Sequence, residues 1–307
     1  MDYDYEVAIV GAGPAGFAAG IYATRAGISA VIFDTGAGGG LLALSPLIEN
    51  YPGFPSIPGM ELSDKMRAHL ENYMKVNMAE EVKGLEVKED SVIVKTPKKE
   101  YFVGAVILAT GTVHRKLGVT GEGKLSGRGV SYCAICDGPF FKGKKAIVVG
   151  GGNSALIEAI ALKQMDIDVT VIHRRDVLRA EDAYKDRAED VGVPIMFQTH
   201  VEEIKGEDKV EKVLLHNVES QQHSEKEVDA VFVSIGEEPQ NQLAKQVGCE
   251  IDDKGFVVTD KKMRTTVKRV YAAGDITGGL RQIVTACAEG AIAALTSMEV
   301  LGKVYPY

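Results

Sequence analysis

Short runs of apolar residues, followed by glycine or by an acidic side chain, mark the beginning of the chain. Val7–Val10 leads into Gly11-Ala-Gly-Pro-Ala-Gly16, and the alanine-rich stretch from Phe17 to Ala26 has a helical composition. Ala30–Phe33 is a second apolar run, and Asp34 ends it. Continuous apolar runs of this kind are typical of parallel strands that are buried on both faces. The pattern therefore predicts a β-α-β unit.

The same pattern recurs near the middle of the chain. Ala146–Val149 leads into Gly150-Gly-Gly-Asn-Ser-Ala155, a helical stretch runs to about Met165, and Val169–Ile172 is the next apolar run. Two β-α-β units predict an α/β protein with two Rossmann-like dinucleotide-binding domains, each a parallel sheet with helices. The 307 residues suit two domains of the usual size.

Shorter segments of alternating character, separated by polar turns, predict a small antiparallel β meander in each domain. These segments are Glu86–Thr96, Glu100–Val103, Val210–Val218 and Glu225–Asp229. We interpret the charged run from Glu202 to Lys212 as a solvated face.

Two further apolar strands, Ala105–Gly111 and Ala230–Gly236, are expected to be the last strands of their units. Val270–Asp275 and the alanine-rich helix expected from Gln282 to Leu301 have no glycine loop of their own, so they should complete the first domain. We therefore predict a discontinuous first domain of residues 1–113 and 241–307, and a second domain of residues 114–240.

Composition and charge exclude several classes of protein. The values of 45% hydrophobic and 25% charged residues are ordinary for a globular chain, and a net charge of −8 offers no general positive field to nucleic acid or to an anionic membrane. The N-terminus is acidic rather than basic, and no apolar run approaches the ~18 residues of a membrane span. We expect a soluble, cytoplasmic protein that binds neither nucleic acid nor membrane.

The first glycine set matches the fingerprint of a dinucleotide site. Gly11 would form the tight turn, Gly13 would let a pyrophosphate approach the backbone, and Gly16 would allow close helix packing. Asp34 would accept a hydrogen bond from a ribose hydroxyl. The alternative is a glycine turn that binds no ligand.

The second glycine set, Gly150, Gly152 and Ala155, is followed by a basic strand end instead of an acidic one. Guanidinium groups bind phosphate in bidentate fashion, so this end favours the 2′-phosphate of NADP over the free hydroxyl of NAD. A solvated basic loop is the alternative. The residues at this strand end are His173, Arg174, Arg175 and Arg179.

Cys133 and Cys136 form the only closely spaced cysteine pair, because Cys249 and Cys287 stand alone. A pair of this spacing can be half of a zinc site, two buried thiols or a redox centre. No second pair of ligands stands at zinc spacing, and a dithiol beside two nucleotide sites can pass two electrons to another disulfide. The adjacent Asp137 can shuttle protons or simply form a turn with Gly138.

The remaining histidines that we considered, His69, His200, His216 and His223, lie in polar contexts, and we assign them no function.

Taken in order, these motifs resemble the low-molecular-weight thioredoxin reductases over nearly the whole chain. The motifs are Gly11–Gly16, Glu49-Asn-Tyr-Pro-Gly53, Ala109-Thr-Gly111, Cys133-Ala-Ile-Cys-Asp-Gly138, Gly150–Ala155, His173-Arg-Arg-x-x-x-Arg179 and Gly274-Asp275 with Arg281-Gln282. The combination is specific, whereas any one motif alone would be weak.

The resemblance implies that the first domain binds FAD and the second NADPH. For FAD it implies Gly11, Gly13, Pro14, Ala15, Gly16, Asp34, Gly39, Gly40, Leu41, Asn50, Val82, Ala109, Thr110, Gly111, Gly274, Asp275, Arg281 and Gln282. For NADPH it implies Gly152, Asn153 and Ser154, with His173, Arg174, Arg175 and Arg179 at the 2′-phosphate end.

The resemblance also implies a cytoplasmic homodimer that passes electrons from NADPH through FAD and the cysteine pair to thioredoxin. Cys136 would face the flavin, Cys133 would attack the partner's disulfide, and Asp137 would transfer protons. Since the cysteine pair and the NADPH site share one domain but must both meet the flavin, we expect residues 114–240 to rotate about the two connecting segments.

One departure from the family leaves alternatives open. Leu41 stands where many members have glutamine, which puts the tuning of the flavin in question. The alternatives are a related reductase that uses NADH, ferredoxin or a reduced deazaflavin, and a flavin-dependent dithiol oxidase, which would not need the three arginines. From a different class, a nucleotide sensor or a zinc-binding protein would show no redox turnover.

Overall fold

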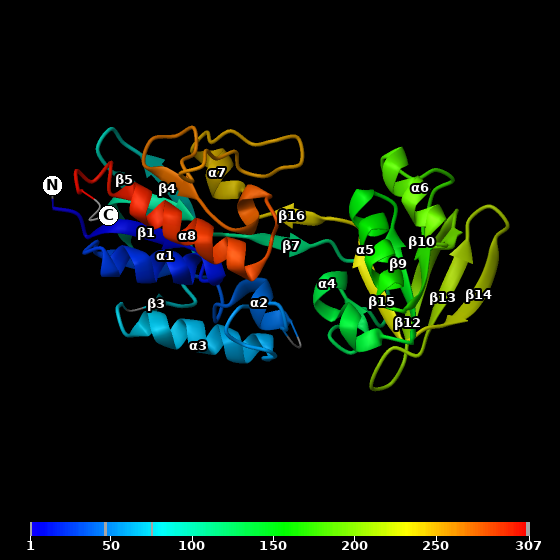
Figure 1. Ribbon diagram of the computed structural model, residues 1–307. Helices are drawn as coiled ribbons and strands as arrows, with labels where there is room; N and C mark the ends of the chain where they lie inside the picture. The colour runs from blue at the N-terminus through cyan, green and yellow to red at the C-terminus, as the bar shows by residue number, and fades with distance from the viewer. Residues whose placement is uncertain (1, 46–47, 75, 305–307) are drawn as a thin grey trace. The chain divides into compact units, whose positions relative to one another are not determined.

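The chain folds into two compact units. The computed structural model describes residues 2–45, 48–74 and 76–304. Unit 1 comprises residues 1–113 and 238–307, and unit 2 comprises residues 114–237 (Figure 1). The second division therefore lies three residues before the predicted position of 240, because the strand that begins at Glu237 already pairs with the first connecting segment.

Unit 1 is built on a seven-stranded sheet in the order β3-β2-β1-β6-β5-β4, with β17 also paired to β6. The strands β3, β2, β1, β6 and β17 run parallel, whereas β4, β5 and β6 are antiparallel neighbours. The strands are β1 (Tyr5–Val10), β2 (Ala30–Phe33), β3 (Val76–Asn77), β4 (Gly84–Val87), β5 (Val92–Lys95), β6 (Glu100–Leu108) and β17 (Val270–Ala272).

The helices of unit 1 are α1 (Pro14–Arg25), α2 (Gly40–Leu44), α3 (Gly59–Glu71), α7 (Gln242–Gln246) and α8 (Ile283–Ser297), with a 3₁₀ turn η2 (Asp275–Thr277). The first and last of these helices lie side by side (Figure 1), and a Cβ added at Gly290 would come within 2.0 Å of the Ala15 carbonyl oxygen. Glycine is therefore required for this close approach. One face of the sheet shares a core with α1 and α8, and the other packs on α7.

Unit 2 contains a parallel sheet and an antiparallel meander. The parallel order is β11-β10-β9-β15-β8, and the meander order is β12-β13-β14. The parallel strands are β8 (Val130–Ser131), β9 (Lys145–Gly150), β10 (Asp168–Ile172), β11 (Ile195–Met196) and β15 (Ala230–Ser234). The meander strands are β12 (Thr199–Lys205), β13 (Lys212–Asn217) and β14 (Gln222–Glu227). The helical segments are α4 (Ala134–Asp137), η1 (Gly138–Phe141), α5 (Asn153–Gln164) and α6 (Asp182–Asp190).

The chain passes between the units twice, at β7 (Thr112–His114) and β16 (Glu237–Pro239), and these two strands pair with each other. The predicted α/β class with two dinucleotide-binding domains is confirmed. The charged side chains of Glu202–Lys212, which we interpreted as a solvated face, are partly or fully exposed, while β12 covers the first part of this run and buries Ile204 in the core of unit 2. In the described ranges, no helix has the length and apolar character that crossing a membrane requires.

Candidate active site and nucleotide loops

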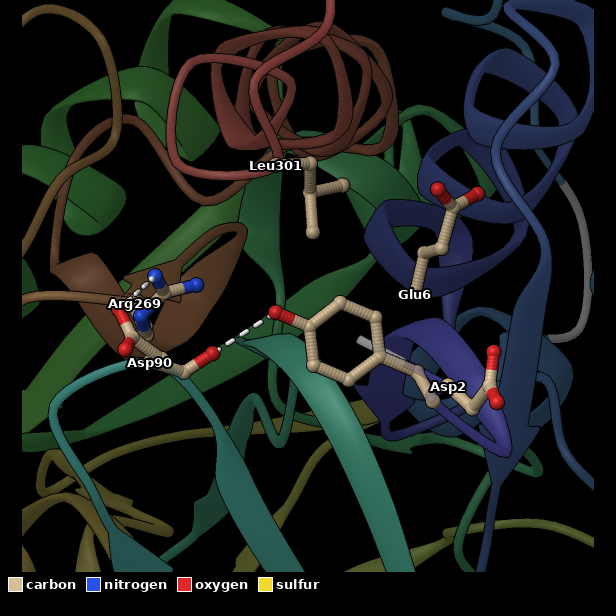
Figure 2. A pocket seen from close by; sticks show the side chains of 6 residues that line it. Asp2, Glu6, Asp90, Arg269 and Leu301 are labelled. Atoms are coloured by element: carbon tan, nitrogen blue, oxygen red, sulfur yellow. Dashed lines mark hydrogen bonds and ion pairs between the residues drawn. The ribbon is translucent and has the colours of Figure 1, made fainter.

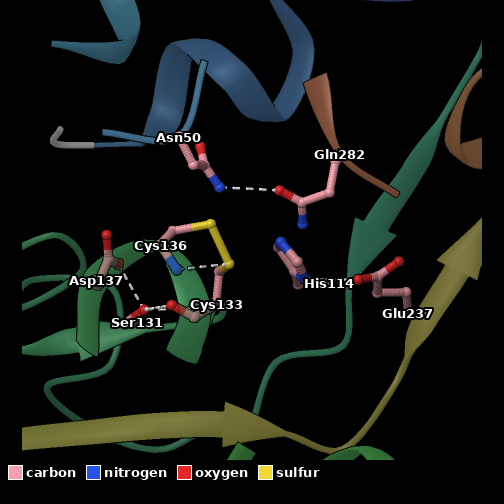
Figure 3. The surroundings of a disulfide bond; sticks show 8 residues. All are labelled: Asn50, His114, Ser131, Cys133, Cys136, Asp137, Glu237 and Gln282. Atoms are coloured by element: carbon pink, nitrogen blue, oxygen red, sulfur yellow. Dashed lines mark hydrogen bonds and ion pairs between the residues drawn. A yellow bond between two sulfur atoms is a disulfide. The ribbon is translucent and has the colours of Figure 1, made fainter. Parts of the chain in front are cut away.

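The two cysteines singled out from the sequence form a disulfide at the start of α4. Their Cα atoms lie 5.3 Å apart, and both side chains are partly exposed (Figure 3). Cys133 is the N-cap of α4, and its Sγ accepts a hydrogen bond of 3.2 Å from the backbone N–H of Cys136. Such a donor stabilises a thiolate better than a thiol, so the local fold favours ionisation of Cys133 once the disulfide is reduced.

Asp137 follows the disulfide and is only 8% exposed. Its Oδ2 accepts a 2.5 Å hydrogen bond from the Ser131 hydroxyl, whereas its Oδ1 is buried without a hydrogen-bond partner (Figure 3). Burial raises the pKa of Asp137, and the bond from Ser131 opposes that rise only in part. An acid with a raised pKa beside a redox pair is suited to proton transfer.

Ser131 is a site residue that sequence reasoning missed. Besides bonding to Asp137, its Oγ accepts a 3.1 Å hydrogen bond from the backbone N–H of Cys133. One hydroxyl therefore positions both the acid and the first cysteine. The only signal in the sequence is a serine two residues before a cysteine, which is too common to be informative.

A second set of residues around the disulfide was also missed. His114 is drawn among its surroundings in Figure 3, stacks on Tyr132 at 4.9 Å and lies 3.6 Å from a Glu237 carboxylate oxygen. The Tyr132 hydroxyl donates a 2.9 Å hydrogen bond to the buried Glu122, and burial together with this bond raises the pKa of Tyr132. The segment before Cys133 is thus held by polar side chains from three parts of unit 2.

In unit 1, the predicted glycine turn lies at the carboxyl edge of the parallel strands. A Cβ at Gly11 would lie 2.2 Å from the Ala109 carbonyl oxygen, and one at Gly16 would lie 1.9 Å from the Gly11 carbonyl oxygen. By contrast, a Cβ at Gly13 would meet nothing within 4 Å. Gly11 and Gly16 are therefore required for packing, whereas the backbone at Gly13 is open for a ligand to approach, with Pro14 and Ala15 beginning α1 behind it.

Asp34 lies beside this turn but is already engaged with the backbone. Its two carboxylate oxygens accept hydrogen bonds from the N–H groups of Ala12 and Gly36, each at 2.8 Å. Gly39 and Gly40 lie against the first glycine turn. The Gly39 N–H donates to the Ala12 carbonyl oxygen at 2.6 Å, and a Cβ at Gly40 would lie 3.6 Å from the Gly13 Cα. Leu41, on α2, is partly buried.

The ends of β6 and β17 complete this edge. Ala273 donates to the Leu108 carbonyl oxygen at 3.0 Å, which places Gly274 near Ala109. The Thr110 hydroxyl donates to the Gln240 carbonyl oxygen, and Gly111 has a φ of +64°. Glu289, a further residue that sequence reasoning missed, accepts hydrogen bonds from the Gly274 N–H at 2.8 Å and from the Thr277 hydroxyl, and so holds the loop that contains Asp275.

The remaining predicted residues of unit 1 lie in two separate regions, one at the start of α8 and one in the core on the other face of the sheet. Asn50 donates a 3.1 Å hydrogen bond to the side chain of Gln282, which caps α8 (Figure 3), and Arg281 precedes it with a φ of +53°. Val82 is buried in the core on the other side of the sheet, with Phe33. Its side chain is therefore part of the fold, and its backbone is the part left for a ligand.

In unit 2, the second glycine loop lies at the carboxyl edge of β9. A Cβ at Gly150 would lie 2.4 Å from the Ser234 carbonyl oxygen, whereas one at Gly152 would meet nothing within 4 Å. Asn153 and Ser154 begin α5, whose first turn has no side-chain cap. The Asn153 amide exchanges two hydrogen bonds with Glu181, at 2.7 and 2.8 Å, which ties the loop to the segment after β10.

His173 and the three arginines follow β10 but differ in environment. His173 is buried, and its ring nitrogens each lie 3.0 Å from a backbone carbonyl oxygen, those of Gly150 and Val177. Its ring therefore helps to shape this loop, and its role at the 2′-phosphate stays a prediction. Arg174, Arg175 and Arg179 are exposed, and none of their guanidinium groups pairs with another residue in the described part of the chain.

Two cavities lie in the two units, the first apart from these loops and the second beside the loop that carries the three arginines. One, of about 460 Å³, is lined in unit 1 by Asp2, Tyr3, Glu6, Asp90, Arg269 and Leu301 (Figure 2). The buried Arg269 donates there to the carbonyl oxygens of Glu89, Gly104 and Val300, so it stabilises the fold. The other, of about 690 Å³, lies in unit 2 against α6 and includes Val177 and Phe197.

Comparisons with known proteins agree with this geometry. The chain matches the model of the pyridine nucleotide-disulphide oxidoreductase family over residues 5–290. It is 44% identical to the thioredoxin reductase of Bacillus subtilis over 94% of this chain and 92% of that protein. The crystal structure of thioredoxin reductase from Streptococcus pyogenes superposes with a TM-score of 0.91 at 41% identity, covering 97% of this chain and 98% of that one. A ferredoxin-flavin thioredoxin reductase from Clostridium acetobutylicum is 35% identical, with a TM-score of 0.53 and coverage of 97% and 98%.

Proposed function

The chain belongs to the pyridine nucleotide-disulphide oxidoreductase family, among its thioredoxin reductases. From that premise we propose that it reduces the disulfide of a thioredoxin with electrons from NADPH, using FAD and the Cys133–Cys136 pair. The observation that carries the proposal is this redox disulfide beside a buried acid of raised pKa. The family implies a flavin and a pyridine nucleotide, and the residues of each unit support one of them.

The choice of NADPH rests on the end of β10. Arg174, Arg175 and Arg179 stand one, two and six residues after His173, and their three positive charges have no carboxylate partner in the described residues. A 2′-phosphate would supply the missing partner, and bonds between guanidinium and phosphate are stronger than neutral ones. NADH, which lacks that phosphate, would leave the arginines in water.

The choice of FAD rests on unit 1. The open backbone at Gly13 and the uncapped start of α1 suit a pyrophosphate, because the first N–H groups of a helix attract anions. Asp34 keeps further acceptor capacity for a ribose hydroxyl. Gly39, Gly40, Ala109, Gly111, Gly274 and Gln282 would surround the rest of the cofactor.

When bound, the nicotinamide and the flavin supply the two electrons that open the disulfide. The protein's own residues then carry out thiol exchange. The Cys133 thiolate, held by the Cys136 N–H, attacks one sulfur of the thioredoxin disulfide and forms a mixed disulfide while the other thioredoxin sulfur leaves as a thiolate. Cys136 then attacks Cys133, the Cys133–Cys136 disulfide re-forms, and the second thioredoxin sulfur leaves. Asp137 supplies and accepts the protons.

The test is a comparison of electron donors on the purified flavoprotein with thioredoxin as acceptor. We expect kcat/KM for NADPH to exceed that for NADH, and Arg175→Ala to lower the preference by about tenfold, the value of one charge-assisted bond of about 1.5 kcal/mol. Lys185→Ala, which removes a cation on α6 from the same unit, is the matched control. Equal use of NADH and NADPH would contradict the proposed donor without affecting the assignment as a reductase.

A different donor is the second candidate, and Leu41 is the observation that favours it. The related protein from Clostridium acetobutylicum is described as a ferredoxin-flavin thioredoxin reductase. If neither nicotinamide reduces the bound flavin but reduced ferredoxin or a reduced deazaflavin does, this candidate replaces the first. We also propose a homodimer in the cytoplasm, as in the family, which sedimentation and cell fractionation test.

A further inference from the structure

Three of the six histidines lie next to one another across the meander of unit 2, although no motif in the sequence groups them. His200 on β12 is directly opposite His216 on β13, and His216 is directly opposite His223 on β14. Glu202 lies on β12 beside them. Residues that face each other across antiparallel strands have Cβ atoms about 5 Å apart, so the three imidazoles are neighbours on one face of the sheet.

The side chains converge on the Glu202 carboxylate. The His216 Nδ1 lies 3.5 Å and the His200 Nε2 lies 3.9 Å from Oε1 of Glu202, and the His223 Nδ1 lies 2.8 Å from Oε2. One ligand atom from each of His200, Glu202 and His216 lies within 4.8 Å of the other two. Ligands at about 2.1 Å from a tetrahedral zinc ion are about 3.4 Å apart, so only small side-chain movements separate this arrangement from a coordination site.

The two strands that carry His200 and His216 are anchored in the core of unit 2. The alternate residues Val201 and Leu215 are buried in the core of unit 2, which fixes His200 and His216 on the outer face. The His216 Nε2 is buried without a hydrogen-bond partner among the described residues, while its Nδ1 faces Glu202. In the described residues, Glu202 pairs only with these histidines and with no lysine or arginine. No permanently charged side chain among those described therefore neutralises the Glu202 carboxylate, and a bound metal ion would do so.

We propose that His200, Glu202 and His216 bind a divalent transition-metal ion of the zinc type, with His223 as the fourth ligand or as the residue that orients Glu202. Imidazole and carboxylate ligands suit zinc and its neighbours in the first transition series, whereas magnesium and calcium prefer oxygen ligands alone. The bound ion would link the first two strands of the meander, and the third through His223.

The experiment is a titration of the untagged flavoprotein with Zn²⁺ by calorimetry and with Co²⁺ by visible absorption, which reports tetrahedral coordination. The protein is kept oxidised so that the Cys133–Cys136 disulfide offers no thiolate to the metal. We expect one ion per chain, a rise in the thermal unfolding temperature with Zn²⁺, and affinity lowered at least tenfold by His200→Asn and by His216→Asn. His69→Asn, which removes an exposed histidine in unit 1, should bind like the wild type.

His200 is 40% exposed, so His200→Asn keeps the test decisive even if His216→Asn fails to fold. Unfolding in the presence of a chelator checks that each variant is folded. The proposal is overturned if the wild type binds no ion, or if His200→Asn binds as tightly as His69→Asn. Magnesium should have no effect at concentrations at which Zn²⁺ saturates, and equal binding of both ions would also overturn it.

Discussion

Gly152→Ala should affect nucleotide binding strongly and the stability of the fold very little. The added Cβ would meet no atom within 4 Å, and the backbone there, at φ −102° and ψ −178°, is allowed to alanine. Alanine restricts the unfolded chain, which stabilises by about 0.4–1 kcal/mol, but it is a poorer N-cap than glycine by a similar amount. The free energy of unfolding should therefore change by no more than about 0.5 kcal/mol.

Nucleotide binding should respond very differently. If the pyrophosphate of NADP⁺ lies on Gly152 and the uncapped first turn of α5, the new methyl group displaces it. Losing one or two charge-assisted hydrogen bonds costs about 2–4 kcal/mol, which corresponds to a dissociation constant about 30- to 1000-fold higher. The flavin content should be unchanged, because Gly152 belongs to unit 2.

The assay is calorimetric titration with NADP⁺, which binds without reducing the protein, at one fixed salt concentration. The matched control is Gly123→Ala, also in unit 2, where an added Cβ likewise meets nothing within 4 Å. It should bind NADP⁺ like the wild type. If Gly152→Ala binds NADP⁺ within threefold of the control, the pyrophosphate does not lie on this loop and the reasoning fails.

Three further predictions follow from other parts of the molecule. Cys136→Ser should accumulate a mixed disulfide between Cys133 and thioredoxin on non-reducing gels, whereas a trap formed only by Cys133→Ser would reverse their roles. Asp137→Asn should lower thioredoxin reduction by about 10²- to 10⁴-fold and remove the fall in activity as pH rises through the raised pKa of Asp137. Because the pKa of Asp137 is raised in the folded state, the free energy of unfolding should fall as pH rises through that pKa. In Asp137→Asn, the free energy of unfolding measured in urea should therefore depend less on pH. An unchanged pH dependence would count against a cost of charging the buried Asp137. Arg269→Met should lower the free energy of unfolding by about 3 kcal/mol, because three carbonyl oxygens lose their donor. The control Lys268→Met, at the exposed neighbouring residue, should change it little. Similar values for the two variants would refute the role of Arg269.

The parts of the fold that could be predicted are those in which neighbours in sequence carry the signal. A buried parallel strand is a continuous apolar run, and a nucleotide loop concentrates its glycines within six residues, as Gly11–Gly16 does. The strand β12 was missed because its charged residues Glu202, Glu203 and Lys205 outnumber its buried apolar residues, Val201 and Ile204. An outer strand of this kind resembles a charged loop until its partner strand is known.

The parts of the site that could not be predicted depend on contacts between distant segments. Glu289 reaches Gly274 from a helix, and Glu122 reaches Tyr132 from a turn. The register that places His200 opposite His216 is set by packing and by a bulge in β12, neither of which has a sequence signature. Glycine motifs identify where a cofactor can approach, but the side chains that hold the loops are found only in three dimensions.

The contact between Gly290 and Ala15 has a consequence for how the chain acquires its structure. Because α1 packs on α8, and α8 follows unit 2 in the sequence, the first unit cannot be completed until α8 has left the ribosome. Unit 2 is one continuous segment, residues 114–237, and can fold earlier, while the helix and strands made before it wait for their partner. A reductase of this build should therefore depend on protection of its N-terminal segment during synthesis, and its inserted unit should be the first part to resist a protease in pulse-labelled nascent chains.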